Sequence, residues 1–553
     1  MTNNPFSAER LLFTPATPDR DAVSIIFAFP NEYSVGITSL GYQIVWATLA
    51  MRPDVDVRRL FTDANEPLPA RSELLGFSLS WELDYVHLLD VLERLEIPIY
   101  SRDRSENHPL IFGGGPVLTA NPEPFADFFD IILLGDGENL LGDFIDAYRD
   151  VRGENRRKTL RHLARVPGIY IPSLYEVTYT APDGAIASIS PIDADIPATI
   201  TKQTYRGNTL SASSVVTENA AWSNIFMVEV VRSCPEMCRF CLASYLTLPF
   251  RVSSLEGSLI PAIDRGLQVT DRLGLLGASI TQHPEFEDLL DYLGKDKFDS
   301  VRLSIASVRT NTVTEKLANI LAKRDTQSIT IAVESGSERV RKIINKKLET
   351  DEIIQAAAHA KSGGLKSLKL YGMVGIPGEE PEDVDRTVEM MRSIKKAVPG
   401  LRLTLGCSTF VPKSHTPFQW FGVDPQAEKR LKFLRKELRS SGIDFRPESY
   451  NWSVIQALIS RGDRRLSSLL ELVRHYGDSV GSYKRAFKQL RGKLPEMDDY
   501  VRTDYSLDRI LPWHHLHGPL PTAILQKHLT ESLQHFRKNG RSERSPITAN
   551  SID

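Results

Sequence analysis

Cysteine is scarce in this chain of 553 residues, which contains four. So few thiols do not make a disulfide framework, and they fit a reducing compartment, so we expect a cytoplasmic protein. The sequence also lacks an apolar run long enough to cross a bilayer, and its first residues, Met-Thr-Asn-Asn-Pro-Phe, show no signal-peptide pattern. We therefore expect no association with membranes.

An excess of charge of one sign is also missing. The formal net charge is −3, with 25% charged and 41% hydrophobic residues. This composition is that of an ordinary globular protein, and it gives no overall attraction to nucleic acid or to anionic membranes. The length exceeds that of one typical domain and predicts three or four units.

Three of the four cysteines stand together, in Arg232-Ser-Cys-Pro-Glu-Met-Cys-Arg-Phe-Cys-Leu242. Cys234, Cys238 and Cys241 have the spacing C-x3-C-x2-C, and closely spaced thiolates collect soft metals or iron–sulfur clusters. A zinc site usually has a fourth Cys or a His at pair-like spacing, and none is near. Three thiolates suit a 4Fe–4S cluster with one open iron. The fourth cysteine, Cys407, ends an apolar run and is predicted to be a packed core thiol.

Residues 1–150 alternate short β-branched runs with amphipathic stretches, which predicts a doubly wound domain with a parallel sheet. Two predicted strands end in glycine loops, Gly113-Gly-Gly-Pro116 and Gly135-Asp-Gly-Glu138. Loops of this kind at the carboxyl edge of an open sheet let a ligand approach the backbone, although a tight turn explains them as well. The predicted ligand-binding glycines are Gly113, Gly114, Gly115, Gly135 and Gly137.

The middle of the chain changes character twice. Residues 151–220 form a linker with a hairpin predicted around Ala-Pro-Asp-Gly184. Residues 221–423 repeat strand then helix six times, which predicts a partial (β/α)6 barrel. The cysteine loop follows the first of these strands, at the face where barrel enzymes carry their active sites. The six predicted strands are Ile225–Val231, Leu273–Gly277, Val301–Ile305, Ile329–Val333, Leu368–Val374 and Leu401–Cys407.

Beyond residue 423 the sequence becomes helical and strongly charged. We expect a helical extension over 424–537 and a disordered tail over 538–553. The run Arg461-Gly-Asp-Arg-Arg465 fits either a phosphate or RNA site or a structural cluster of salt bridges.

The cysteine motif, with Phe240 before its third cysteine, resembles that of the radical S-adenosylmethionine (SAM) superfamily. The later strand ends resemble the SAM-binding segments of that family, although the Glu of its Gly-Gly-Glu segment is missing from Leu275-Leu-Gly-Ala-Ser279. The resemblance implies that SAM is bound by Ser279, Ser304, Glu334, Arg339 and Gly375. A surface ion pair of Glu334 with Arg339 is the alternative for those two residues.

The glycine loops, with Asn121-Pro-Glu-Pro, resemble cobalamin-binding domains fused to radical SAM barrels. Phe410 to Trp420, Ser460 to Arg465 and Ile510 to Trp513 are similar to a subfamily of these fusions whose substrates are largely unknown. No Asp-x-His-x-x-Gly motif precedes the barrel, and His87 is predicted to be a surface or packing residue. Cobalamin would therefore bind without a protein histidine on cobalt, or the fold has lost it.

The resemblance implies an enzyme that cleaves SAM reductively with a 4Fe–4S cluster and generates a 5′-deoxyadenosyl radical. Cobalamin would add C-methylation of a small or macromolecular substrate, and flavodoxin or ferredoxin would supply electrons. A tRNA- or RNA-modifying enzyme and a non-catalytic cluster-bearing sensor or scaffold are the alternatives. Nucleic acid is a possible partner that the charge does not indicate. Because no cysteine precedes Cys234, the resemblance to methylthiotransferases, which carry a second cluster there, loses support.

Overall fold

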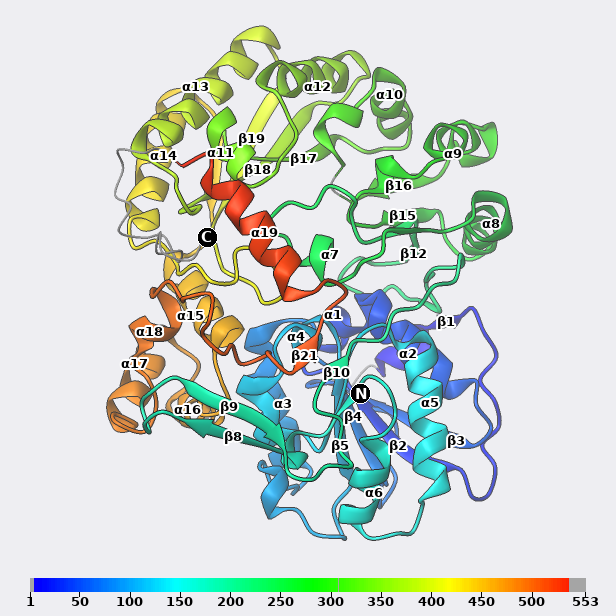
Figure 1. Ribbon diagram of the computed structural model, residues 1–553. Coiled ribbons are helices and arrows are strands. Elements are labelled where there is room, and N and C mark those ends of the chain that lie inside the picture. Colours follow the sequence, from blue (N-terminus) through cyan, green and yellow to red (C-terminus); the bar gives the residue numbers. More distant parts are fainter. Residues whose placement is uncertain (1–3, 307, 537–553) are drawn as a thin grey trace.

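The computed structural model describes residues 4–306 and 308–536. An N-terminal sheet domain and a barrel lie one above the other, and helix α19 (Thr522–Leu533) runs between them (Figure 1). The predicted disordered tail lies outside the described residues. No helix in these two ranges is both long enough and apolar enough to span a lipid bilayer.

The N-terminal sheet has six strands in the order β3-β2-β4-β5-β6-β7. The first five run parallel, and only β7 is antiparallel to its neighbour. The order of the parallel strands is that of a flavodoxin-like doubly wound sheet, so the predicted parallel sheet is confirmed. The strands are β2 (Val23–Ala28), β3 (Val55–Leu60), β4 (Leu74–Ser78), β5 (Leu110–Gly114), β6 (Ile131–Leu133) and β7 (Ile169–Tyr170).

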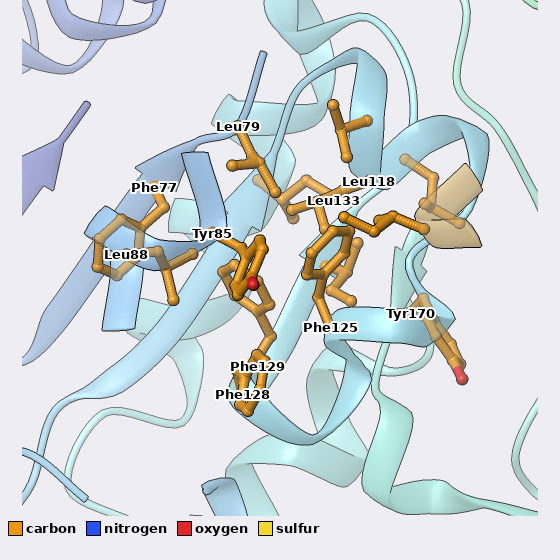
Figure 2. Packing of buried hydrophobic residues seen from close by; sticks show 14 of the residues in the cluster. Phe77, Leu79, Tyr85, Leu88, Leu118, Phe125, Phe128, Phe129, Leu133 and Tyr170 are labelled. Carbon is orange, nitrogen blue, oxygen red and sulfur yellow. The ribbon is translucent and has the colours of Figure 1, made fainter. Parts of the chain in front are cut away.

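Three helices of this domain follow strands of the sheet, and α2 is capped by the side chain of Ser39. Figure 2 shows the aromatic core on one side of the sheet, in which the rings of Phe77 and Phe129 meet edge to face at 6.2 Å. Burial of these side chains stabilises the domain by roughly 2 kcal/mol each. The helices are α2 (Leu40–Ala50), α3 (Tyr85–Arg94) and α5 (Gly137–Asp150).

The linker contains the predicted hairpin, with β8 (Tyr175–Tyr179) antiparallel to β9 (Ile186–Pro191). A second part of the linker, β10 (Ile200–Thr201), pairs with β21 (Leu516–His517) near the C-terminus. The linker is therefore joined to the C-terminal extension through backbone hydrogen bonds.

The barrel contains all six predicted strands, and each runs parallel to its neighbours. A single bridge between Val308 and Ile331 joins a sheet of three strands to a sheet of four. The fourth strand of the second sheet, β20 (Asp444–Pro447), lies in the stretch predicted to be a helical extension. The other strands are β12 (Ile225–Glu229), β15 (Arg272–Leu276), β16 (Arg302–Ile305), β17 (Ser328–Glu334), β18 (Ser367–Val374) and β19 (Arg402–Thr409).

After β20 the described chain is mainly helical, as predicted. The helices α15 (Tyr450–Arg461) and α16 (Leu466–Tyr476) pack on the N-terminal domain, and α17 (Val480–Gln489) follows them. Helix α19 then returns to the barrel, where it contacts α11 (Glu338–Ile343).

Candidate functional site

The three clustered cysteines lie on the loop between β13 (Val231–Arg232) and the short helix α7 (Leu242–Tyr245). Cys238 is 7% exposed. Burial raises the pKa of its thiol to about 12, and Cys241 and Cys234 are near enough to raise it further. A thiol in such surroundings keeps its proton unless a metal displaces it.

The cysteine loop is held by the segment that follows α11. Asn345 Nδ2 donates hydrogen bonds to the carbonyl oxygens of Glu236, at 3.1 Å, and Met237, at 3.0 Å. Arg239 Nη1 donates to the carbonyl oxygens of Lys342 and Ile343, each at 2.9 Å. These bonds fix the backbone of the loop between its first and third cysteines.

Residues with left-handed backbone surround the thiols. Ser233 and Met237 in the loop have φ of 71° and 54°, and Glu334 and Asn345 beside it have φ of 63° and 56°. For a residue other than glycine, the left-handed region of φ and ψ costs on the order of 1 kcal/mol in conformational free energy. Such residues are therefore found mainly where the surrounding structure holds a functional geometry.

Glu334 ends β17 and is 8% exposed. Its carboxylate pairs with Lys346, whose Nζ lies 3.3 Å from Oε1. Lys346 also acts on Cys238, because the positive charge of its ammonium lowers the pKa of that thiol. The structure thus places a buried cation beside the predicted cluster ligands, where it would stabilise thiolates.

The donor set of the loop fits an iron–sulfur cluster in kind, since all three donors are thiols on one anchored loop. No group of three or more His, Cys, Asp or Glu side chains is already gathered for an ion in the part of the chain that the structure describes. The ligand role of Cys234, Cys238 and Cys241 stays a prediction.

A polar network links the next strand ends to the cysteine loop. Ser279, after β15, donates a hydrogen bond to Gln282, whose Nε2 donates to Glu236 Oε1 at 2.6 Å. Arg309, after β16, lies 2.6 Å from the other oxygen of Glu236. Our sequence analysis missed Glu236, although a carboxylate between two cluster cysteines was a visible signal.

The remaining predicted SAM-binding residues lie in different surroundings. Ser304 is half-buried in β16, beside Gly274 of β15. Gly375 donates its N–H to Glu379 Oε2 at 2.7 Å, and a Cβ on it would lie 2.9 Å from Ala427. Packing of the chain therefore accounts for Gly375.

Arg339 does not pair with Glu334, so the two residues are not the surface ion pair considered above. Its guanidinium binds Asp383 and donates to the carbonyl oxygens of Gly378, at 2.8 Å, and His535, at 3.2 Å. With these partners the side chain fastens the chain after α19 to the barrel. The role of Arg339 in SAM binding stays a prediction.

A cavity of about 240 Å³ opens at the carboxyl edge of the N-terminal sheet. Its inner part lies between the sheet and the helices α2 and α5, and is lined by aromatic and aliphatic side chains such as Phe77, Phe112 and Leu140. Its mouth is lined by the two glycine loops and by Arg232 of the barrel. No histidine belongs to the described residues of its lining. His87 lies on α3 and its side chain is 46% exposed, as expected for a surface residue.

The five predicted glycines differ in whether their surroundings would accept a side chain. A Cβ on Gly113 would lie 2.4 Å from the ring of Phe129. Gly115 and Gly135 have φ of 108° and 116°, and a Cβ there would lie 2.6 and 2.1 Å from backbone oxygens. These three are required by the fold itself.

Gly114 and Gly137 are different, because a Cβ on either would make no close contact. The nearest atoms to a Cβ on each would be 3.7 Å away, which is ordinary contact. Both residues line the cavity. A flat ligand lying against the backbone would use the space that these two residues leave empty.

The loop Gly135-Asp-Gly-Glu138 joins the cavity to the cysteine loop. Arg232, two residues before Cys234, lies 2.7 Å from Glu138 Oε1 and 3.5 Å from Asp136 Oδ1. Arg251 binds the other oxygen of Asp136. The acidic residues of the loop therefore hold the barrel arginines, a contact that sequence patterns did not reveal.

The run Arg461-Gly-Asp-Arg-Arg465 is structural. Arg461 is 1% exposed and donates to the carbonyl oxygens of Tyr500 and Thr503. Arg464 lies 3.2 Å from Glu123 of the N-terminal domain. Because these guanidinium groups are occupied within the protein, the run does not present a phosphate or RNA site.

The other motifs of the extension also serve packing. Asn121 Nδ2 donates to the carbonyl oxygens of Ser460, at 3.1 Å, and Gly462, at 2.9 Å. Trp513 is buried and donates to Gln419 Oε1 at 2.9 Å. Cys407 is 3% exposed in the core of the barrel, which confirms the prediction of a packed thiol.

Two family models match separate parts of the chain. Residues 58–172 match the model described as radical SAM proteins, N-terminal, and residues 228–391 match that of the radical SAM superfamily. The first match covers most of the N-terminal sheet. The second covers the end of β12, the cysteine loop and the four barrel strands β15 to β18.

The chain is also similar to two other proteins. An uncharacterized protein of Methanocaldococcus jannaschii, MJ0966, is 26% identical over 84% of this chain and 94% of its own length. An uncharacterized methyltransferase of Pyrococcus horikoshii, PH0819, is 24% identical over 51% of this chain and 57% of its own.

A solved structure shares the fold. It is that of the radical SAM methyltransferase TsrM from Kitasatospora setae, with cobalamin and a [4Fe–4S] cluster bound. The TM-score is 0.50 at 13% identity, over 72% of this chain and 77% of that one. With the cysteine loop after the first strand of an open parallel barrel and both family models matched in order, this chain belongs to the radical SAM superfamily of enzymes.

Proposed function

We propose that this protein is a cobalamin-dependent radical SAM enzyme that methylates a carbon atom of its substrate. The observation that carries the proposal is the contact of Arg232 with Asp136 and Glu138. It joins the mouth of the glycine-lined cavity to the start of the cysteine loop, so a ligand in the cavity mouth faces the barrel that carries the cysteines.

Cys234, Cys238 and Cys241 would hold a 4Fe–4S cluster. When bound, such a cluster supplies the electron that cleaves SAM to a 5′-deoxyadenosyl radical. Lys346 places a positive charge beside the thiolates, and Asn345 and Arg239 hold the loop that carries them. Burial of Cys238 keeps water from that side of the site.

The polar groups that surround the cysteine loop would bind SAM. Glu334, held by Lys346, presents its carboxylate at the end of β17. The hydroxyl of Ser279 and the carboxylate of Glu236 belong to one hydrogen-bonded network. Charged hydrogen bonds of this type each contribute about 2 kcal/mol to binding. Ser304 remains a predicted contact on the neighbouring strand.

The N-terminal cavity would hold cobalamin. Gly114 and Gly137 leave room for its flat face, and the apolar inner part of the cavity suits an aromatic tail. When bound, this group supplies a transferable methyl group. Since no histidine lines the cavity in the described residues, cobalt would have no protein nitrogen ligand.

The test is anaerobic purification of the full chain with iron, sulfide and hydroxocobalamin, followed by incubation with SAM and dithionite. We expect about four irons per chain, bound cobalamin without a histidine signature, and formation of 5′-deoxyadenosine. Stoichiometric zinc in place of iron would reject the proposal. A cluster without SAM cleavage would favour a sensor or scaffold, and SAM cleavage without bound cobalamin would reject the methyl transfer alone.

A further inference from the structure

A second cavity, of about 430 Å³, lies inside the open barrel. It is lined by the inner faces of β17, β18, β19 and β20, which are hydrogen-bonded to one another in that order. The side chains that matter are Glu334, Lys369, Tyr371, Ser408, Arg446 and Glu448.

The two faces of these strands have opposite character. On β18, Leu368 and Leu370 are fully buried against the helices, whereas Lys369 and Tyr371 alternate with them and point to the inside. The inside of a closed barrel is packed with branched apolar side chains. Polar residues at these positions are not needed for folding, which points to a ligand.

Glycine at position 406 lets the aromatic ring of Tyr371 lie close to the backbone of β19. Gly406 of β19 pairs with Tyr371, and a Cβ on Gly406 would lie 3.3 Å from that ring. Tyr371 is 39% exposed, which is high for an aromatic residue on a central strand. Its ring therefore offers an open face on which a flat group can stack.

Lys369 has a hydrogen-bond partner but no acidic one among the residues that the structure describes. Its Nζ lies 3.3 Å from the hydroxyl of Tyr371 and 4.7 Å from the centre of the ring. Arg446 at the rim is already paired with Asp444 at 2.8 Å, and the exposed Glu448 lies at the end of β20. The half-buried ammonium of Lys369 is thus the group in this cavity left to bind an anion.

The cavity borders the cysteine loop through Glu334. This residue lines the cavity, and its charge acts on the thiol of Cys238. Lys346, which binds Glu334, also interacts electrostatically with the thiols of Cys238 and Cys241. A molecule in the cavity would therefore lie next to the proposed SAM site.

We propose that this cavity binds the substrate, a small molecule that carries a carboxylate or a phosphate next to a flat ring. Lys369 binds the anionic group, and Tyr371 stacks on the ring. The inference rests on the proposed function for the reaction that follows, but binding is measured without it.

The test uses fluorine NMR of para-fluorobenzoate and para-fluorophenyl phosphate with the full chain. The neutral para-fluorobenzamide is the matched probe without charge. We expect one or both anions to bind, the amide to bind at least about tenfold more weakly, and Lys369→Met to lose about tenfold in affinity for the anions. Lys369→Arg should restore most of the binding. Lys366→Met, an exposed lysine before the same strand, should bind like the wild type.

Several results would overturn the inference. These are equal binding to wild type and Lys369→Met, equal binding of the amide and the anions, or binding of neither anion to the wild type. Preference for one anion identifies the substrate as a carboxylate or as a phosphate. SAM cleavage is measured in the same wild-type preparation. Its absence with intact anion binding would reject the proposed function and leave this cavity as a binding site.

Discussion

The cysteine thiols of this protein differ more in the charges that surround them than in how far they are buried. Cys238 and Cys407 are both buried, and burial raises the pKa of each. Cys238 has two thiols, Glu334 and the ammonium of Lys346 nearby, whereas the charges that act on Cys407 are all carboxylates. A cation near a thiol favours its thiolate, so of these two thiols Cys238 is the one suited to bind iron.

The first prediction follows from this difference. Cys238→Ala should lower the iron content after anaerobic reconstitution from about four per chain to well below one, because two thiolates do not hold the cluster. Cys407→Ala is the matched control and should keep its iron, with a loss of about 1 kcal/mol in unfolding free energy. Iron and sulfide analysis is the measurement, and full iron in Cys238→Ala would contradict the assignment.

The second prediction separates the two kinds of glycine. Gly114→Val should fold normally and weaken hydroxocobalamin binding by at least about tenfold, because its Cβ makes only ordinary contacts with the fold and the side chain occupies part of the cavity. Gly142→Val on α5, outside the cavity lining, is the binding control. Equilibrium binding followed by absorbance is the measurement, and unchanged affinity in folded Gly114→Val would remove cobalamin from this cavity.

Gly115→Val tests whether the fold requires a glycine at the position next to Gly114. The left-handed backbone and the approach to the Leu79 carbonyl oxygen predict a loss of about 3 kcal/mol or more in unfolding free energy. A stable Gly115→Val would show that this loop adjusts, and the distinction between the glycines would then fail.

At the level of elements, the N-terminal domain and the C-terminal extension meet in a buried polar junction. Glu123, Tyr170 and Arg464 form its hydrogen-bonded part, and the ring of His515 packs on Tyr170 at 5.0 Å. His515 is 2% exposed, and neither ring nitrogen has a hydrogen-bond partner among the described residues. Its Nε2 lies 3.8 Å from Glu123.

This junction predicts a pH dependence of stability. Burial lowers the pKa of His515 to about 4, against the attraction of Glu123 and with the repulsion of Arg464. The folded state then binds fewer protons than the unfolded state between about pH 4 and 6.5, so stability is present above that window and lost as pH falls through it. We expect a loss of roughly 2–3 kcal/mol from this residue.

The matching variant is His515→Phe, which keeps the ring and cannot take up a proton. It should reduce the slope of unfolding free energy against pH in that window, measured by urea denaturation. The exposed His87→Gln is the control and should leave the slope unchanged. The slope of His515→Phe matching that of the wild type would contradict the pKa direction. Burial also lowers the pKa of His415 to about 4. Because this residue is unchanged in both variants, part of the slope of unfolding free energy against pH should remain in each.

On the scale of the whole molecule, polar contacts at several places hold the N-terminal sheet domain to the rest. Two of them are charged junctions described above, the contact of Glu123 with Arg464 and the contact of Asp136 and Glu138 with Arg232. The second junction lies between the two proposed cofactor sites. The relative position of the cavity mouth and the cysteine loop therefore depends on a few charged side chains.

The last prediction tests that dependence. Arg232→Met leaves Asp136, Glu138 and Glu229 without one cation, and should cost about 2–4 kcal/mol in stability because these carboxylates are largely buried. Hydrogen–deuterium exchange should rise in both the Gly135–Glu138 loop and the cysteine loop. Arg324→Met, a buried arginine within the barrel, should destabilise the protein without raising exchange in these two loops. Unchanged exchange in Arg232→Met would show that the junction does not hold the sites together.

Local patterns were enough to determine the parallel sheet, the six barrel strands, the hairpin and the placement of the cysteine loop. This is because the spacing of apolar residues along a strand or helix reflects which side is buried, and a glycine or cysteine motif is contiguous in sequence. The chemistry of three adjacent thiols is likewise a property of the sequence.

Only the tertiary structure decided which charged residues meet. Glu334 pairs with Lys346 and not with Arg339, the glycine loop binds Arg232, and Arg464 of the extension pairs with Glu123 of the N-terminal domain. It also showed that two of the five loop glycines would accept a Cβ without a close contact, and that Lys369 lies inside the barrel. These contacts join residues far apart in the chain, and their energies depend on burial and distance, which a local pattern does not contain.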